Sequence, residues 1–158
     1  MRGMTAKALL LLPLLWLTAA AAGVPPYSQG YDPGRDPYAD ARDAIERAGR
    51  SGRHVLIVVG GDWCTWCHEL DRVIKADPLS REALATGYVL LKVNVSDANP
   101  NSAFMASMPR LDGYPQLFVS DGHGQLLHAQ DPSAFLADGA YDSVRVRTFL
   151  LRWAPRSP

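Results

Sequence analysis

Two patterns of hydrophobic positions follow one another along the chain. Apolar residues at helical spacing between charged ones predict an amphipathic helix over 39–49, ended by Gly49 and Gly52. A continuous aliphatic run over 55–59 is typical of a strand covered on both faces of a sheet. The predicted folded part therefore begins with a helix followed by a buried strand, and the glycine pair at 60–61 ends that strand.

The same alternation continues to the C-terminus. In chain order we predict helices over 65–75 and 79–86, a strand over 88–95, a short helix within 101–111, strands over 116–120 and 125–129 joined by a turn at 121–124, and a closing helix over 144–153. This order implies a mixed sheet, with a parallel part built by crossovers and an antiparallel hairpin at its edge. We expect an α/β fold of three layers, with helices on both faces of the sheet.

The N-terminal residues have the pattern of a targeting segment. Arg2 and Lys7 precede an apolar run that ends in small residues, which predicts a cleaved signal peptide over 1–22. An uncleaved membrane anchor needs about 20 apolar residues, and this run reaches that length only if the alanines are counted. We expect an irregular segment rich in Pro, Gly, Tyr and Asp over 23–38, a folded domain over 39–154, and no membrane span after cleavage.

Charge excludes some classes of partner. Loss of 1–22 would leave 14 basic and 16 acidic residues, a nearly neutral balance without runs of like charge. Nucleic acids and anionic membranes attract proteins with a clear excess of positive charge. We therefore expect no nucleic-acid partner.

The chain has two cysteines, Cys64 and Cys67. A bridge across so short a loop removes little entropy from the unfolded chain, and small exported proteins that use disulfides as staples carry several widely spaced pairs. The pair therefore indicates redox chemistry. Because it stands at the junction of a strand and a helix, free amides and the helix dipole favour a thiolate. We predict that Cys64 is an exposed nucleophile and that Cys67 resolves its mixed disulfide.

The residues around the pair point to a family. The segment Trp63, Cys64, Thr65, Trp66, Cys67 resembles the active site of thioredoxin-like proteins, and the element order over 39–153 follows that family's. With Gly61, Asp62, Asp77, Pro78, Asp121 and Gly122, the pattern is most similar to the C-terminal, electron-delivering domain of the bacterial periplasmic thiol:disulfide interchange protein.

The resemblance implies a thioredoxin-like α/β/α sandwich that exchanges disulfides with exported proteins, in the bacterial periplasm or outside the cell. A membrane protein is one candidate for the source of its electrons. Thioredoxin-like proteins also place a cis-proline before the terminal hairpin, where this chain has Tyr114 and Pro115. The resemblance assigns these two residues, with Trp63 and Trp66, to partner docking.

One departure from the family concerns proton transfer. Val58 stands where thioredoxins carry a buried acid, so His68, Glu69 and Asp62, or water, are the remaining proton acceptors. The three side chains equally fit solvated positions in the first helical turn. The preference for a reductase or electron carrier over an oxidase rests on the resemblance, because Thr65 and Trp66 differ from the dipeptides of the best-known members.

Three alternatives use the same residues. Cys64, Cys67 and His68 form the Cys-x-x-Cys-His signature of covalent haem, with Met105 or Met108 as a sixth ligand, although a strand rather than a helix leads into this motif. A metal site has at most three ligands here, so we expect neither a metal nor a cofactor. A non-catalytic binding module would use Trp63, Trp66 and Tyr114 only as an apolar docking patch.

Overall fold

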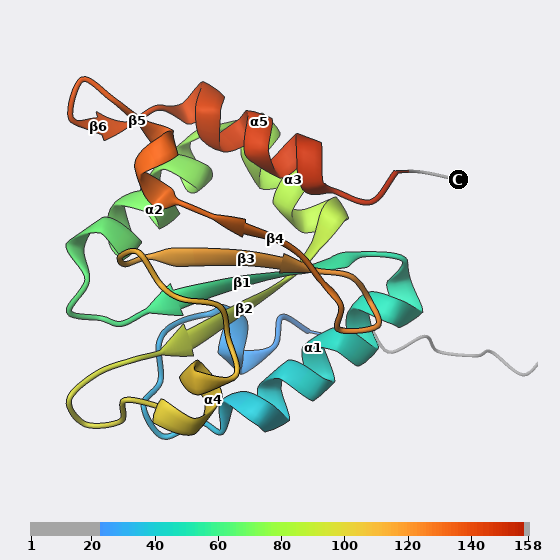
Figure 1. The fold of residues 1–158 in the computed structure, drawn as a ribbon. Helices are drawn as coiled ribbons and strands as arrows, with labels where there is room; N and C mark the ends of the chain where they lie inside the picture. The colour runs from blue at the N-terminus through green and yellow to red at the C-terminus, as the bar shows by residue number, and fades with distance from the viewer. Residues whose placement is uncertain (1–22, 157–158) are drawn as a thin grey trace, which may run out of the picture.

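The computed structural model describes residues 23–156, so the predicted signal peptide lies outside the described residues. The main elements are helices α1 (Pro37–Ser51), α2 (Thr65–Ala76), α3 (Pro78–Gly87), α4 (Ser102–Ala106) and α5 (Ser143–Trp153), and strands β1 (His54–Gly60), β2 (Tyr88–Asn94), β3 (Gln116–Ser120) and β4 (Leu126–Gln130) (Figure 1). Short additions are 3-10 turns η1 (Pro26–Ser28) and η2 (Pro132–Phe135) and strands β5 (Leu136–Ala137) and β6 (Ala140–Tyr141).

The four long strands form one mixed sheet in the order β2-β1-β3-β4. Strand β1 pairs with β2 in parallel and with β3 antiparallel, and β3 pairs with β4 antiparallel. Every residue of β1 after His54 is buried, as expected of a strand with neighbours on both edges and helices on both faces. The predicted mixed sheet with a terminal antiparallel hairpin is confirmed.

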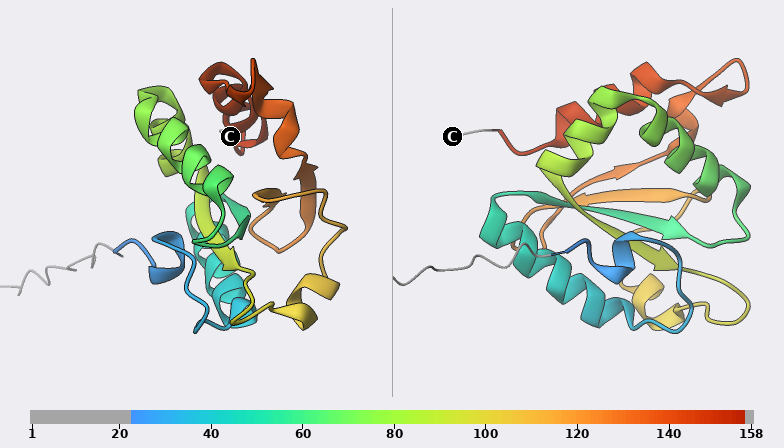
Figure 2. Two further views of the ribbon diagram at one scale, coloured as in Figure 1. Left: turned by 90° about the vertical axis from the view of Figure 1, so that its left-hand side faces the viewer. Right: turned by 180° about the vertical axis from the view of Figure 1, so that it is seen from behind.

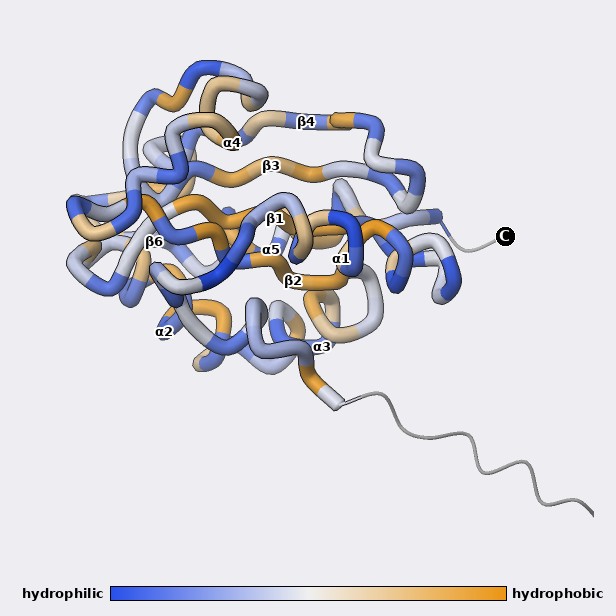
Figure 3. Tube along the Cα trace, turned by 90° about the horizontal axis from the view of Figure 1, so that it is seen from below, coloured by the Kyte–Doolittle hydropathy of each residue, from blue (hydrophilic) through white to orange (hydrophobic). Residues whose placement is uncertain are grey.

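Helices cover both faces of the sheet, which confirms the predicted three layers. Helices α2, α3 and α5 lie on one face, and α1 and α4 on the other (Figures 1 and 2). Because side chains alternate along a strand, Leu56 and Val58 pack on the α2 face while Val55, Ile57 and Val59 pack on the α1 face. Within the described residues, the strands at the centre of the sheet are accordingly strongly hydrophobic (Figure 3).

Helix α1 is longer than the sequence pattern predicts. It begins at Pro37 because the Asp36 side chain accepts a hydrogen bond from the Tyr38 N–H and a proline fits the first turn. It continues past Gly49 and ends at Gly52, whose φ of 62° closes the helix. The predicted role of Gly52 in ending the helix is confirmed, but the predicted boundary at Gly49 is wrong: this glycine remains helical and lies against the backbone of Gly122 in the β3–β4 turn.

The segment over 130–142 has structure that hydrophobic periodicity does not predict. Strands β5 and β6 have two residues each, too few to show an alternating pattern, and their turn uses positive φ at Asp138 and Gly139.

The N-terminal segment over 23–38 contributes Tyr27 and Tyr31, both almost fully buried, to the two core clusters. Within the described range, no helix has the length and apolar character needed to cross a membrane.

Candidate active site

The two cysteines occupy the junction between β1 and α2. Strand β1 ends at Gly60, and Cys64 is the N-cap residue of α2, with its Sγ 3.1 Å from the Cys67 N–H that donates to it. Cys64 and Cys67 form a disulfide, with their Cα atoms 5.2 Å apart. The prediction that this helix begins between the two cysteines is confirmed. Cys64 Sγ thus lies at the N-terminal end of the helix and accepts a hydrogen bond from the Cys67 amide.

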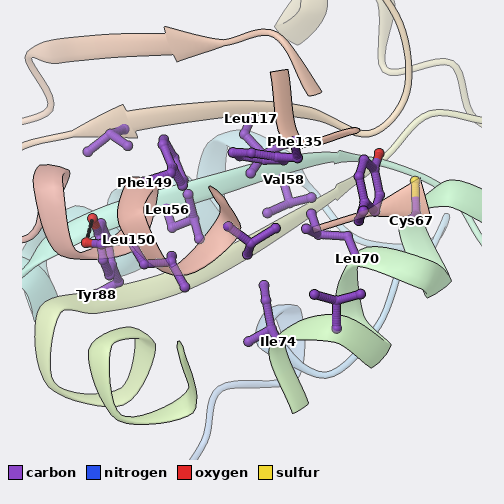
Figure 4. Close-up of a cluster of buried hydrophobic side chains, with 14 of the residues drawn as sticks. Leu56, Val58, Cys67, Leu70, Ile74, Tyr88, Leu117, Phe135, Phe149 and Leu150 are labelled. Carbon is purple, nitrogen blue, oxygen red and sulfur yellow. Dashed lines mark hydrogen bonds between the residues drawn. The ribbon is translucent and has the colours of Figure 1, made fainter. Parts of the chain in front are cut away.

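The predicted exposure of Cys64 is wrong in this oxidised state. Cys64 is 4% exposed and Cys67 is 1% exposed. A Cβ atom added to Gly60 would lie 2.4 Å from Cys67 Sγ, so this sulfur rests directly on the backbone of β1. Because the disulfide ties Cys64 to that sulfur, both cysteines belong to the buried cluster of the α2 face, in which Cys67 lies at one end beside Leu70 (Figure 4).

Exposed aromatic side chains flank the buried disulfide. Trp63, Trp66 and Tyr114 are 56%, 42% and 36% exposed. The Trp63 indole N–H donates to the Val95 carbonyl at 2.7 Å, and its ring meets Tyr114 edge-on at 5.3 Å. Trp66 makes the same kind of contact, at 5.0 Å, with Tyr141 of β6, whose burial raises its pKa to about 12. Three of the four residues assigned to docking are therefore accessible to a partner.

Pro115 lies at the same end of the sheet as the cysteines. The Tyr114–Pro115 peptide bond is cis, and Pro115 itself is buried. In the antiparallel register Gln116 is opposite Val59, so Pro115 adjoins the end of β1 from which the chain turns toward Cys64. Segments about 50 residues apart in the chain thus meet at one site.

The three candidates for proton transfer lie at the start of α2. The His68 ring nitrogen Nε2 is 2.8 Å from the Asp62 carbonyl oxygen, and Asp62 is exposed. Glu69 accepts two hydrogen bonds from Arg72, which lower the pKa of its carboxyl. In the described part of the chain, no hydrogen bond joins His68 or Glu69 to Cys67.

Sequence reasoning missed two buried residues on the α2 face, Lys92 and Tyr31. Val58 shares the buried cluster with Cys67, and its partner on β2 is Lys92, an 8% exposed lysine that pairs with Asp71 of α2. The Lys92 ammonium lies 5.1 Å from the centre of the Tyr31 ring. A lone lysine within the apolar strand β2 was the available signal, since lysines are almost never fully buried without a partner.

The structure separates the residues that the haem alternative needs together. Met105 and Met108 pack against the cluster of the α1 face, whereas the cysteines belong to the cluster of the α2 face. His68 is engaged by the Asp62 carbonyl. Over residues 23–156, no three His, Cys, Asp or Glu side chains are grouped closely enough to hold a metal ion.

Sequence comparisons identify proteins that are similar to this chain. A family model described as thioredoxin-like matches residues 36–122. The thiol:disulfide interchange protein DsbD of Ralstonia nicotianae is 30% identical over 115 residues, which cover 72% of this chain and 19% of the relative. The protein of the same name in Escherichia coli K12 is 31% identical over 74 residues, or 47% and 13% of the two chains. The chain thus spans less than a fifth of these relatives' length.

Solved structures show the same fold. A disulphide isomerase from Xylella fastidiosa Temecula1 matches with a TM-score of 0.64 and 21% identity, covering 77% of this chain and 94% of that one. The C-terminal domain of Neisseria meningitidis DsbD in the oxidised form matches with a TM-score of 0.54 and 16% identity, covering 73% and 91%. At such identities the likeness establishes the fold alone.

The close approach of Cys67 Sγ to Gly60 predicts that a larger residue at position 60 destabilises the oxidised protein. In Gly60→Ala, the new methyl group would overlap Cys67 Sγ and press on Tyr31, so we expect the oxidised protein to lose about 1 to 3 kcal/mol of unfolding free energy. Urea denaturation of the oxidised protein measures this loss. Gly113→Ala is the matched control, because a Cβ at Gly113 meets nothing within 4 Å. Equal urea midpoints for the two variants would contradict the packing of Cys67 against β1.

Proposed function

Because the chain belongs to the thioredoxin-like family, we propose that it exchanges disulfides with other proteins through Cys64 and Cys67, as a disulfide reductase or electron carrier. One observation carries the proposal: Cys64 caps the N-terminus of α2 and is joined to Cys67 within the first turn. This position favours a thiolate over a thiol, because the amides and dipole of the helix end stabilise negative charge.

The exchange follows from this geometry. In the dithiol form, the Cys64 thiolate attacks one sulfur of a partner disulfide, forms a mixed disulfide and releases the partner's other sulfur as a thiolate. The Cys67 thiolate then attacks Cys64 Sγ, closes the Cys64–Cys67 bond and releases the partner's remaining sulfur as a thiolate. Two electrons pass from the protein to the partner, and a donor that reduces Cys64–Cys67 reverses the same steps.

The surface around the cysteines supports a protein as substrate. Trp63, Trp66 and Tyr114 offer apolar area with few rotatable bonds, which is typical of residues that anchor a partner. With Pro115 they form the docking surface of this proposal. Asp62, in the loop before Cys64, and His68 and Glu69, at the start of α2, can pass protons to and from bulk water.

We place the reaction outside the cytoplasm, in the bacterial periplasm. The signal-peptide pattern over 1–22 and the similarity to thiol:disulfide interchange proteins support this compartment. Its partners are then exported proteins with thiols or disulfides, and a membrane protein is the candidate donor of electrons. The reductive direction is supported by the resemblance of the active-site segment to an electron-delivering domain.

A resolving-cysteine variant tests the exchange and its order. In Cys67→Ser, the Cys64 mixed disulfide has no intramolecular thiol to release it, so we expect covalent complexes with a disulfide-containing protein such as insulin. Non-reducing electrophoresis detects these complexes, and reduction dissolves them. Cys64→Ser is the matched control and should form far fewer. Equal trapping by both variants would contradict the assigned order, and no trapping by either would favour a non-catalytic binding module.

A tyrosine variant tests the docking surface. Tyr114→Ala should raise the KM for a protein disulfide by roughly tenfold, because an interfacial aromatic anchor contributes on the order of 1 to 2 kcal/mol. The rate with oxidised glutathione, which is too small to span the surface, should stay near the wild-type value. Tyr38→Ala is the control: Tyr38 is similarly exposed but packs against Phe104, in the helix on the other face. A tenfold loss with both substrates would show that Tyr114 supports the cysteines instead of the partner.

A further inference from the structure

The Tyr31 hydroxyl has no hydrogen-bond partner within residues 23–156, although Tyr31 is only 4% exposed. Two further buried tyrosines, Tyr27 and Tyr88, are each 2% exposed, and their hydroxyls are hydrogen-bonded. The Tyr27 hydroxyl donates to Asp43, and the Tyr88 hydroxyl donates to the Leu150 carbonyl. A buried hydroxyl without a partner costs free energy, and such groups are rare in native proteins. The Tyr31 hydroxyl is therefore a candidate to form a hydrogen bond in another state of the protein.

Tyr31 and Cys67 meet over the same glycine. A Cβ atom added to Gly60 would lie 2.4 Å from Cys67 Sγ and 3.2 Å from the Tyr31 hydroxyl oxygen. The hydroxyl and the sulfur are therefore no farther apart than the sum of these two distances. Both residues belong to the buried cluster of the α2 face, so the hydroxyl and the sulfur both lie in the protein interior.

The groups around Tyr31 keep its hydroxyl protonated. Burial, and secondarily the Asp71 charge, raise the pKa of Tyr31 far above its ordinary value. The charged and titratable groups around Tyr31 come from several elements, namely Lys92 from β2, Asp71 from α2, Asp62 from the loop before Cys64, and Tyr141 from β6. A protonated phenol is a hydrogen-bond donor throughout the physiological range.

We propose that the Tyr31 hydroxyl donates a hydrogen bond to Cys67 Sγ when the disulfide is reduced. In the disulfide, Cys67 Sγ is neutral and a weak acceptor, whereas a thiolate is a charged and much stronger acceptor. Tyr31 thereby stabilises the form of Cys67 that resolves the mixed disulfide. This inference rests on the proposed exchange function. It gives Cys67 a hydrogen-bond donor from the same buried cluster as Val58, the residue that stands in place of an acid.

Single-thiol variants isolate the effect. In a Cys64→Ser background, Cys67 is the sole thiol, and its ionisation is followed by the ultraviolet absorbance of the thiolate against pH. Adding Tyr31→Phe should move the midpoint of this titration upward by about one unit, the size expected on losing a hydrogen bond to a charged group. In a Cys67→Ser background, the same change should leave the midpoint of Cys64 unmoved.

Tyr88→Phe is the matched control, because it removes another buried hydroxyl from the same cluster, one bonded to the Leu150 carbonyl. It should leave both midpoints unchanged. An unchanged Cys67 midpoint in Tyr31→Phe, or equal shifts in the two single-thiol backgrounds, would overturn the proposal. A purely structural role for the hydroxyl predicts a lower melting temperature without a shift in the titration.

The wild-type chain provides a second test that needs no change at Tyr31. In the reduced protein, the NMR signal of the Tyr31 ring carbon that carries the hydroxyl should follow the ionisation of Cys67, and it should stay flat in Cys67→Ser. A flat signal in both proteins would contradict the hydrogen bond. These titrations need no partner, so their failure differs from failure of the exchange function, which appears in the trapping of insulin.

Discussion

The site depends on the close packing of the first turn of α2 against the end of β1. Gly60 ends the strand without a side chain, and Cys67 Sγ occupies the space that a Cβ atom would take. Helix α2 starts at Thr65, one residue after its N-cap Cys64, so its first turn lies against this end of the strand. The disulfide is thereby buried, and Cys64 Sγ accepts a hydrogen bond from the Cys67 amide at the N-terminal end of the helix.

The layers of the fold hold this contact in place. Strand β1 lies inside the sheet, and its alternate side chains enter both clusters, so its end cannot shift without disturbing both faces. Helix α2 is anchored by Leu70, Val73 and Ile74 on its buried side. Strand β3 pairs beside β1 and brings Tyr114 and Pro115 to the same end. The exchange chemistry therefore rests on a rigid scaffold, while the partner meets an aromatic surface.

Hydrophobic periodicity, with glycine and proline positions, was enough to predict the main sheet, the main helices and the start of α2 between the cysteines, but not β5 and β6 or the full length of α1. The burial of Cys64 could not be predicted, because it results from the distant contact of Cys67 with Gly60 and from the disulfide itself. Tyr31 lies in an aperiodic segment whose packing depends on non-local contacts, so sequence patterns carry no sign of its neighbours. Lys92 was detectable as the one charge in an apolar strand, but its pairing with Asp71 required the fold.

The reduction potential of the Cys64–Cys67 couple tests the account most directly. Equilibration with glutathione mixtures of known ratio, followed by counting free thiols, measures it on the intact protein. A reductase or electron carrier should have a potential near that of thioredoxin, about −270 mV, at which reduced Cys64 and Cys67 pass electrons on to a partner disulfide. A potential near −120 mV, typical of a strong oxidase such as DsbA, would contradict the proposed direction of electron flow.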